Sequence, residues 1–490
     1  MLESIDYKNI FKYFEEISQV PRGSYHNEKI SEYLVEFAKS HGLDYRMDDA
    51  RNVVIKKPAS EDCKNQEPVM LQGHMDMVCV STDGSHDFQN EPLPIRIEGD
   101  YVYSEGTTLG GDDGIALAYM LAVLDSDAYT HPPIEAVFTT DEEVGMDGAR
   151  ALDVSDLKAK TLINIDNEEE GILLVSCAGG ASADVRWKGK KENREGSCLR
   201  VSVNGLAGGH SGTEIDKHPT NASILLGRLL AGAYQKIPFF LAAFEGGDKD
   251  NVITGAADAT ILCEDRTRAE ELSKILTDRA AELMGELQSQ EPDVTIGIRK
   301  PEQSELPCFD RTFTETVLSF LNLVITGVQV YSSDVPGMVE SSLNMGVART
   351  EETGISLAFS LRSQKRSYKD YMIEKLALLA RCLASGSQKE QISYEFRIRG
   401  EYPAWDYKRD SKLRERMVEE FRNCFGREAK VEGIHAGLEC GIFSEKIPGM
   451  DIVSFGPDIQ NIHTVHERLS IPSAKRNFDY FIRVLERLAE

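Results

Sequence analysis

Five short clusters of metal-binding residue types are spread along the 490-residue chain. They read Gly-His-Met-Asp at 73–76, Gly-Gly-Asp-Asp-Gly at 110–114, Asp-Glu-Glu-Val-Gly at 141–145, Asn-Ile-Asp at 164–166 and His-Thr-Val-His-Glu at 463–467. Each cluster follows or ends an apolar run, so a strand or a helix would hold its side chains in place. Imidazole and carboxylate ligands on rigid elements, with one carboxylate left free as a base, are what a two-metal hydrolase needs.

The first two clusters each admit a metal-binding and a purely structural interpretation. His74 and Asp76 are two residues apart, so on a strand both side chains point to the same face. His74 could then bind a metal while Asp76 supports it, although a surface strand can also carry both residues. Asp112 follows two glycines and precedes a helical pattern, where it could bridge two cations. The alternative is a turn in which Asp112 or Asp113 caps the helix.

The remaining clusters add carboxylates and imidazoles. The adjacent Glu142 and Glu143 would repel each other unless a cation lies between them or one keeps a raised pKa. We assign Glu143 to a metal and Glu142 to proton transfer, with a solvated acidic loop as the alternative. Asp166 ends a further strand candidate. His463 and His466 are three residues apart, and either could be a ligand or could only cap or pack.

Taken together, the clusters predict one site for two divalent cations. Two histidines and three carboxylates, one of them bridging, complete such a site. Nitrogen and oxygen ligands without a thiolate favour Zn²⁺, Mn²⁺ or Co²⁺, and the ligand types alone do not choose among them.

The elements that must position these residues alternate between strand and helix in the first 180 residues. Strand candidates at 69–72, 134–138 and 161–165 each run into a cluster. Helical patterns occupy 115–124 and, as two helices, 10–37. This alternation predicts an α/β fold with a central, mostly parallel sheet covered by helices. In such sheets ligands collect at the carboxyl ends of strands, where most of the clusters fall.

The pattern changes near residue 180, which predicts an interrupted first domain. We expect a catalytic domain formed by 1–180 and 400–490, with an inserted α+β domain at 181–399. Within the insertion, 251–263 and 342–361 are weakly alike and each leads into a long helical pattern, which suggests an internal duplication. The chain must return to the first domain, because His463 has no ligand partners in its own segment. Ser473 is the expected N-cap of the last helix.

Bulk properties exclude several classes of function. A formal net charge of −26 opposes binding to nucleic acid or anionic lipid. No apolar run reaches about 18 residues, so no membrane span is expected. The nine cysteines show no Cys-x-x-Cys pair, which favours reduced thiols. The first residues lack a secretory signal, so the expected compartment is the cytoplasm.

The clusters, in this order, resemble the M20 metallopeptidases, and look closest to the Xaa-His (aminoacyl-histidine or β-alanyl-histidine) dipeptidases. Val-Pro-Arg-Gly-Ser at 20–24, Thr-Thr-Leu-Gly at 107–110 and His-Ala-Gly-Leu-Glu-Cys-Gly at 435–441 extend the resemblance over nearly the whole chain. It implies a catalytic α/β domain interrupted by a lid domain. One departure is Ile-His-Thr-Val-His-Glu at 462–467, where relatives often have Pro-His-Ser-Pro-Asp-Glu.

The resemblance also implies a role for each matching residue. The expected metal ligands are His74 and Asp166 for one ion, Glu143 and His463 for the other, and Asp112 as the bridge. Asp76 would orient His74, and Glu142 would be the general base. In the lid, His210 of Gly-Gly-His-Ser-Gly at 208–212 would stabilise the oxyanion. In dimeric relatives this histidine comes from the partner subunit, so a homodimer is one arrangement the resemblance allows. Asn251, Arg362 and Gly437 would bind the substrate backbone and its terminal carboxylate.

The predicted function is hydrolysis of the amide bond of dipeptides, including Xaa-His substrates. A hydroxide held between two divalent ions would attack, with Zn²⁺ the expected metal and Mn²⁺ or Co²⁺ the alternatives. A small peptide is the expected partner. The main alternative is another M20 hydrolase, such as a tripeptidase or an N-acyl amino acid deacylase. A non-enzymatic protein on a degenerate scaffold would have lost Glu142 or a ligand, and none is missing.

Overall fold

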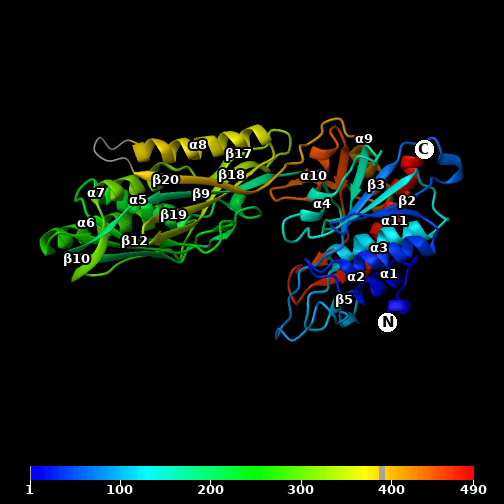
Figure 1. Ribbon diagram of the computed structural model, residues 1–490, viewed down its shortest axis with the longest axis horizontal. Coiled ribbons are helices and arrows are strands. Elements are labelled where there is room, and N and C mark those ends of the chain that lie inside the picture. Colours follow the sequence, from blue (N-terminus) through cyan, green and yellow to red (C-terminus); the bar gives the residue numbers. More distant parts are fainter. Residues whose placement is uncertain (1, 386–391) are drawn as a thin grey trace. The chain divides into compact units, whose positions relative to one another are not determined.

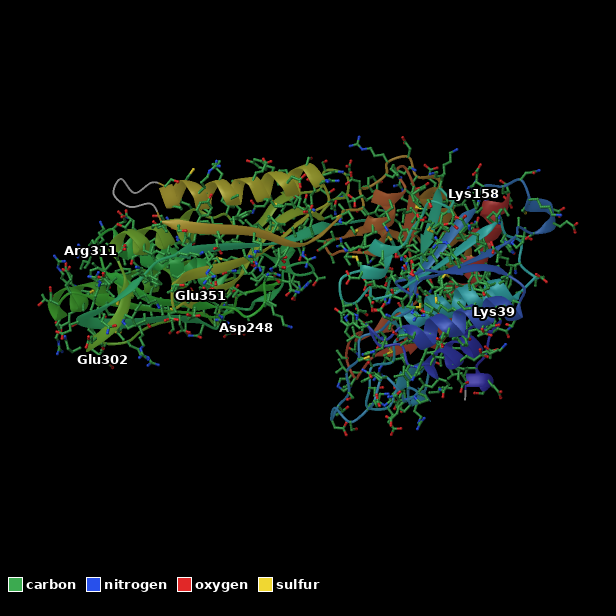
Figure 2. The ribbon with its side chains drawn as sticks, in the orientation of Figure 1. Lys39, Lys158, Asp248, Glu302, Arg311 and Glu351 are labelled. Atoms are coloured by element: carbon green, nitrogen blue, oxygen red, sulfur yellow. The ribbon has the colours of Figure 1, made fainter. Side chains whose placement is uncertain are left out.

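The computed structural model describes residues 2–385 and 392–490, and these form two compact units (Figure 1). Unit 1 comprises Met1–Cys177, Trp405–Gly433 and Leu438–Glu490; unit 2 comprises Ala178–Ala404 and Ile434–Gly437. Charged side chains such as Lys39 and Lys158 of unit 1 and Asp248 and Glu302 of unit 2 lie on the surface (Figure 2). None of the helices in the described part of the chain has the length and apolar character needed to span a membrane.

Unit 1 is built on an eight-stranded sheet whose centre is parallel. The strands in spatial order are β1 (Asp44–Met47), β2 (Val53–Lys57), β6 (Ile134–Thr139), β3 (Val69–His74), β7 (Thr161–Asn164), β22 (Asp451–Ser454), β8 (Ile172–Cys177) and β21 (Lys430–Ile434). β3 pairs in parallel with β6 and β7, and β22 pairs in parallel with β7. β2 and β8 join this centre as antiparallel strands. β22 therefore lies between β7 and β8, although it comes far later in the chain.

Helices cover both faces of this sheet. One face packs into the core of unit 1 with α1 (Ile10–Ser18), α2 (Glu28–Ser40), α3 (Gly111–Asp125), α9 (Lys412–Phe425) and α11 (Ile471–Ala489). On the other face, α10 (Glu439–Lys446) contacts the strands and α4 (Asp147–Ala151) lies beside it (Figure 1). Every residue of α3 from Gly111 to Leu124 is buried, which explains its apolar sequence on all sides. The predicted α/β class with a mostly parallel central sheet is confirmed.

Side-chain alternation divides the strands between the two faces. In β3, Val69 and Leu71 enter the helix-packed core, whereas Gln72 and His74 point to the opposite face. Asn164 in β7 pairs with Gln72, so it lies on the same face. A separate four-stranded sheet contains β23 (Ile459–Gln460), β24 (Arg468–Ser470), β5 (Tyr101–Ser104) and β4 (Ile95–Glu98). Short 3₁₀ helices cover Leu2–Ser4, Glu61–Cys63 and, in unit 2, Ile215–Lys217.

The predicted N-cap of the last helix was wrong. Helix α11 begins at Ile471, and the side chain of Ser470 accepts the backbone N–H of Ser473. Pro472 lies in the first turn, where its missing N–H costs no intrahelical hydrogen bond. Ser473 is therefore inside the helix, and its hydroxyl donates to Glu170 Oε2 at 2.9 Å.

Unit 2 is a twisted antiparallel sheet packed against four helices. The main strands in spatial order are β15 (Thr295–Ile298), β10 (Lys191–Asn204), β14 (Ala257–Cys263), β12 (Phe240–Gly246), β18 (Val339–Glu351), β19 (Gly354–Ser363), β9 (Gly179–Lys188) and β20 (Ser393–Tyr402). β16 (Glu302–Phe309) also pairs with β10, β17 (Gly327–Tyr331) pairs with β18, and β11 (Gly209–His210) pairs with β13 (Val252–Ile253). One apolar core joins the sheet to α5 (Ala222–Tyr234), α6 (Arg266–Leu287), α7 (Arg311–Leu323) and α8 (Arg366–Ser385).

The element order of unit 2 runs twice through the same sequence. Strand, helix, two strands, helix and strand occur as β10, α5, β12, β14, α6, β15 and again as β16, α7, β18, β19, α8, β20. Strand β9 and the short strands β11, β13 and β17 are additional to this pattern. An internal duplication and its domain boundaries stay predictions, with the second occurrence beginning near β16.

Candidate active site

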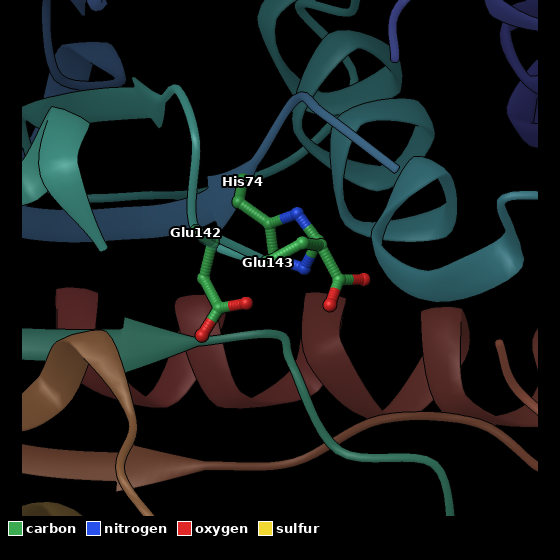
Figure 3. Close-up of side chains that lie close together, drawn as sticks. All are labelled: His74, Glu142 and Glu143. Carbon is green, nitrogen blue, oxygen red and sulfur yellow. The ribbon is translucent and has the colours of Figure 1, made fainter. Parts of the chain in front are cut away.

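Three neighbouring strand ends of unit 1 carry the candidate site. His74 ends β3, Glu142 and Glu143 follow β6, and Asp166 follows β7. The parallel register pairs His74 with Thr139 at the end of β6. Because the three strands run parallel and in register, their carboxyl ends meet at one edge of the sheet. Figure 3 shows the His74 imidazole with the carboxyl groups of Glu142 and Glu143 close to it.

Asp112 lies between two histidines that are distant in the sequence. Its Oδ1 is 3.1 Å from His74 Nε2, and its Oδ2 is 3.2 Å from His463 Nε2. His463 Nε2 is also 2.9 Å from Glu143 Oε1, and His74 Nε2 is 3.8 Å from Asp166 Oδ1. One carboxylate therefore joins two ligand groups, each made of a histidine and a further carboxylate.

The spacing of these atoms fits metal coordination. Tetrahedral ligands at about 2.0–2.2 Å from a metal lie about 3.3–3.6 Å from one another. The four distances of 2.9 to 3.8 Å lie within about 0.4 Å of that spacing, three of them shorter and one longer. The ligand atoms of Asp112, Glu143 and His463 all lie within 4.8 Å of one another. The residues present can thus hold divalent cations through nitrogen and oxygen atoms.

The carboxylates of the site favour the protonated, positively charged form of both imidazoles. Hydrogen bonds with Asp112 and Glu143 raise the pKa of His463 to about 10. Burial lowers the pKa of His74, but Asp112 and Asp76 outweigh burial and raise that pKa well above its ordinary value. The negative charges that stabilise a proton on each of these imidazoles would also stabilise a metal cation bound there instead of the proton.

Asp76 contacts both His74, a predicted metal ligand, and the backbone of Glu142, the predicted base. It is completely buried, its Oδ1 is 3.4 Å from His74 Nδ1, and the same oxygen accepts the backbone N–H of Glu142 at 3.0 Å. Its Oδ2 accepts the hydroxyl of Ser24 at 2.8 Å. Burial raises the pKa of Glu142 to about 8, and the negative charges of Glu439 and Glu143 add to this rise. The backbone carbonyl of Asp76 lies closer to His74 Nδ1, at 3.1 Å, so Asp76 contacts this imidazole through both its backbone and its side chain.

The structure separates the two histidines of the last cluster. His463 contacts Asp112 and Glu143. His466 is exposed and does not belong to any potential metal-binding group within residues 2–385 and 392–490. A further carboxylate, that of Asp113, forms a potential metal-binding group with His74 and Asp166. Its Oδ2 accepts the backbone N–H of His74 at 3.2 Å. The sequence offered Asp113 only as a possible helix cap.

The four remaining predicted site residues belong to unit 2. His210 lies in β11, opposite Val252, and the neighbouring Ser211 N–H donates to the Asn251 carbonyl at 2.9 Å. Arg362 donates from Nη1 to the Tyr402 hydroxyl at 2.8 Å. Gly437 ends the short segment Ile434–Gly437 that joins unit 2.

The charge of Arg362 acts on two histidines of unit 2. Burial lowers the pKa of His210, and Arg362 lowers it further. The same two causes, in the same order, lower the pKa of His435 to about 3. His435 was noted only as part of a motif, and its backbone carbonyl lies near the position of Gly212 in the His210 loop. Arg362, His210 and His435 thus form one local cluster.

Three buried charged residues of unit 1 had no predicted role. Glu439 Oε2 accepts from Gln72 Nε2 at 2.6 Å and from the Thr139 hydroxyl at 2.7 Å, beneath the ligand-bearing strand ends. Arg22 and Glu467 contact the loop that precedes Asp112. All three lie in motifs that the sequence presents, but their partners are between 53 and 367 residues away along the chain, so local pattern could not assign them.

Comparison with known proteins shows the family and the fold of the chain. The model of Peptidase family M20/M25/M40 matches residues 70–490. The cytosol non-specific dipeptidase of Escherichia coli strain K12 is 33% identical over 490 residues, covering 99% of each chain. The structure of aminoacylhistidine dipeptidase from Vibrio alginolyticus is 33% identical and superposes with a TM-score of 0.91, also over 99% of each chain.

A more distant structure shares the fold. Aminopeptidase PepT from Bacillus cereus superposes with a TM-score of 0.59 at 16% identity, covering 99% of this chain and 100% of its own. The family match spans most of the chain, and the similar dipeptidases span all but a few residues. The chain belongs to peptidase family M20/M25/M40.

Proposed function

We propose that the protein is a dipeptidase that uses two divalent metal ions, with Xaa-His dipeptides among its substrates. Two of its relatives are named as dipeptidases, one non-specific and one for aminoacylhistidines. We also propose a cytoplasmic location, because one of these relatives is a cytosol enzyme and all nine cysteines are free thiols.

The carboxylate of Asp112 carries this proposal. Each of its oxygens faces a different histidine, at 3.1 Å from His74 and 3.2 Å from His463. A carboxylate that only capped α3 would have no reason to lie between two imidazoles. We assign His74 and Asp166 to one ion, His463 and Glu143 to the other, and Asp112 to both. Zn²⁺ is the first choice for such a ligand set, and Mn²⁺ or Co²⁺ would also fit.

The proton transfers of hydrolysis are assigned to side chains of the protein. When bound, the two cations would polarise the substrate carbonyl and lower the pKa of a water molecule. Glu142 would accept a proton from that water and deliver it to the leaving nitrogen. Asp76 supports this role, because the same Oδ1 that lies beside His74 accepts the Glu142 N–H.

A cavity in unit 1 offers room for part of a substrate. It has a volume of about 560 Å³ and is lined by both Glu143 and the 86–89 loop. That volume is within the range of about 300–1,000 Å³ for small-ligand sites. Met77, Val78 and Phe88 provide apolar lining, and His26 and Gln89 provide polar groups. This mixed lining suits a pocket that accepts more than one side-chain type next to the metal ligand.

Arg362 of unit 2 is the proposed partner of the substrate carboxylate. Its side chain is 8% exposed, and its Nε has no hydrogen-bond partner in the described structure. A buried guanidinium donor without an acceptor is unfavourable, and a carboxylate would satisfy it. We further propose that Asn251 and Gly437 bind the substrate backbone and that His210 stabilises the oxyanion.

A metal-screened assay over a substrate panel tests the proposal. Metal-free protein is loaded in turn with Zn²⁺, Mn²⁺ or Co²⁺ and given carnosine, Ala-His and Gly-Gly, and release of free amino acids is measured. A tripeptide and an N-acyl amino acid are tested alongside. Dipeptide cleavage that requires added metal is the expected result. Cleavage of only the tripeptide or the acylated amino acid would replace the dipeptidase assignment with that activity.

A further inference from the structure

The loop that presents Asp112 is held between two buried side chains of opposite charge. Glu467 is 2% exposed and Arg22 is 1% exposed. Neither belongs to the ligand set, and both reach the loop from distant segments: Glu467 from the segment after His463 and Arg22 from the turn before α2. A buried charge is unfavourable unless it is fully compensated, so the contacts of these two residues indicate what they do.

Glu467 accepts hydrogen bonds from four consecutive backbone amides. Its Oε2 accepts the N–H of Leu109 at 2.9 Å and of Gly110 at 3.1 Å. Its Oε1 accepts the N–H of Gly111 at 2.7 Å and, more weakly, of Asp112 at 3.4 Å. The carboxylate thus fixes the peptide groups that lead into the proposed bridging ligand. Because His463 lies four residues before Glu467, the same contact joins the segments of two proposed ligands.

Arg22 contacts the same loop by donating hydrogen bonds to backbone carbonyls. Its Nη2 donates to the carbonyl of Gly110, and its Nη1 donates to the carbonyls of Met75 and Asp76, both at 3.2 Å. These two carbonyls directly follow His74. The peptide groups of Gly110 are therefore held at the N–H by Glu467 and at the carbonyl by Arg22. We name this arrangement of Arg22, Gly110 and Glu467 the loop clamp.

We propose that Arg22 and Glu467 are positioning residues that set the place of Asp112 between the two metal ions. Through the loop clamp, the segments of His74, Asp112 and His463 move as one body. The inference rests on the proposed metal centre. It goes further in stating that the distance between the ions depends on two side chains that touch neither ion.

Glu467→Gln tests this with little change in volume. The amide oxygen can still accept one pair of loop N–H groups, but the amide nitrogen then faces the other pair as a donor against donors. The matched control is Glu135→Gln in the same unit. Glu135 is a buried carboxylate at the opposite end of β6, and it accepts the N–H groups of Lys158 and Ala159 at 3.0–3.1 Å. Both variants lose comparable charge-assisted hydrogen bonds, and only one lies at the clamp.

The measurement uses Mn²⁺ as the probe. Full-length wild type, Glu467→Gln and Glu135→Gln are stripped of metal, and binding of Mn²⁺ is followed by calorimetry. The spin-coupled signal of a carboxylate-bridged Mn²⁺ pair is followed by electron paramagnetic resonance. Wild type should bind two ions and show the coupled signal. Glu467→Gln should bind the second ion on the order of 10–100-fold more weakly and lose or shift the coupled signal. Glu135→Gln should match wild type in both readouts, even if its melting temperature falls.

A second pair of variants keeps the test informative if Glu467→Gln does not fold. Arg22→Lys retains the charge but cannot donate to three carbonyls from one planar group. Its control is Lys57→Met, because Lys57 is a buried cation that donates to the carbonyls of Val123 and Leu124. Arg22→Lys should also weaken the second ion and alter the coupled signal.

Unchanged second-ion affinity and an unchanged coupled signal in a folded clamp variant would overturn the proposal. That outcome differs from failure of the metal centre itself, in which wild type would bind no pair of ions.

Discussion

Replacing Gly110 with alanine should destabilise unit 1 by about 2–5 kcal/mol. Gly110 has φ of +66°, a left-handed conformation that costs an L-residue about 1–2 kcal/mol. An added Cβ would lie 2.5 Å from Arg22 Nη2 and 2.8 Å from Met77 Sδ. Arg22 cannot withdraw without breaking its contacts to three carbonyls, and Met77 is 2% exposed. Such overpacking adds about 1–3 kcal/mol to the conformational cost.

Gly99→Ala separates the two contributions. Gly99 also has a left-handed backbone, with φ of +57°, and lies in unit 1 between β4 and β5. No described heavy atom outside its immediate neighbours lies within 4 Å of the position its Cβ would take. This variant should therefore show only the conformational cost of about 1–2 kcal/mol.

Urea denaturation of the metal-free proteins, followed by far-ultraviolet circular dichroism, measures both variants. Removing metal ensures that lost ion binding does not add to the difference. The transition assigned to unit 1 should shift more for Gly110→Ala than for Gly99→Ala, by the overpacking term of about 1–3 kcal/mol. Equal shifts would show that the Arg22 side chain yields without cost, which would refute the rigidity we assign to the loop clamp.

Three further predictions concern the site and unit 2. Glu142→Gln should keep two metal ions by elemental analysis and lose about 10²–10⁴-fold in kcat, and near-normal turnover would remove Glu142 from proton transfer. His463→Ala should lose one metal ion while His466→Ala loses none, because only His463 contacts Asp112 and Glu143; the reverse result would reassign the ligand. Burial and Arg362 lower the pKa of His435 to about 3, so the folded protein binds this proton less readily than the unfolded chain. Its contribution to stability should be complete above about pH 6.5 and fall by about 1.4 kcal/mol per pH unit as the pH drops toward 4. Melting curves of wild type and His435→Gln at pH 7 and pH 5 measure this, and equal pH dependence in the two proteins would contradict it.

The central strands could be predicted because their sequence signals are local. Apolar runs at 69–72, 134–138 and 161–165 became β3, β6 and β7, each ending at polar site residues. In a parallel sheet covered on both faces, strands are short apolar runs, and their carboxyl ends stand out as abrupt changes to polar residues. The grouping of the clusters at one edge followed from that fold class.

Long-range polar contacts could not be predicted in the same way. Glu467 belongs to the fifth cluster, but it binds amides more than 350 residues before it, and the cluster itself does not indicate these partners. Arg22 likewise lies in a short polar turn, where an exposed side chain is the usual expectation. The choice between His463 and His466 also needed three dimensions, since it depends on which way the loop turns toward Asp112. Ser473 was mistaken for a cap because Pro472 allows the helix to begin three residues earlier than expected, with Ser470 as its cap.

The place of β22 has a consequence for synthesis on the ribosome. β7 and β8 are consecutive in the chain, yet β22 lies between them in the sheet. About 270 residues separate the end of β8 from β22, which corresponds to roughly 14–55 s of translation at about 5–20 residues per second. During that interval unit 2, which is nearly continuous in sequence, can fold first. The nascent sheet of unit 1 meanwhile has an open slot with unpaired backbone on both sides, so a chain that stops before Asp451 exposes two strand edges to aggregation.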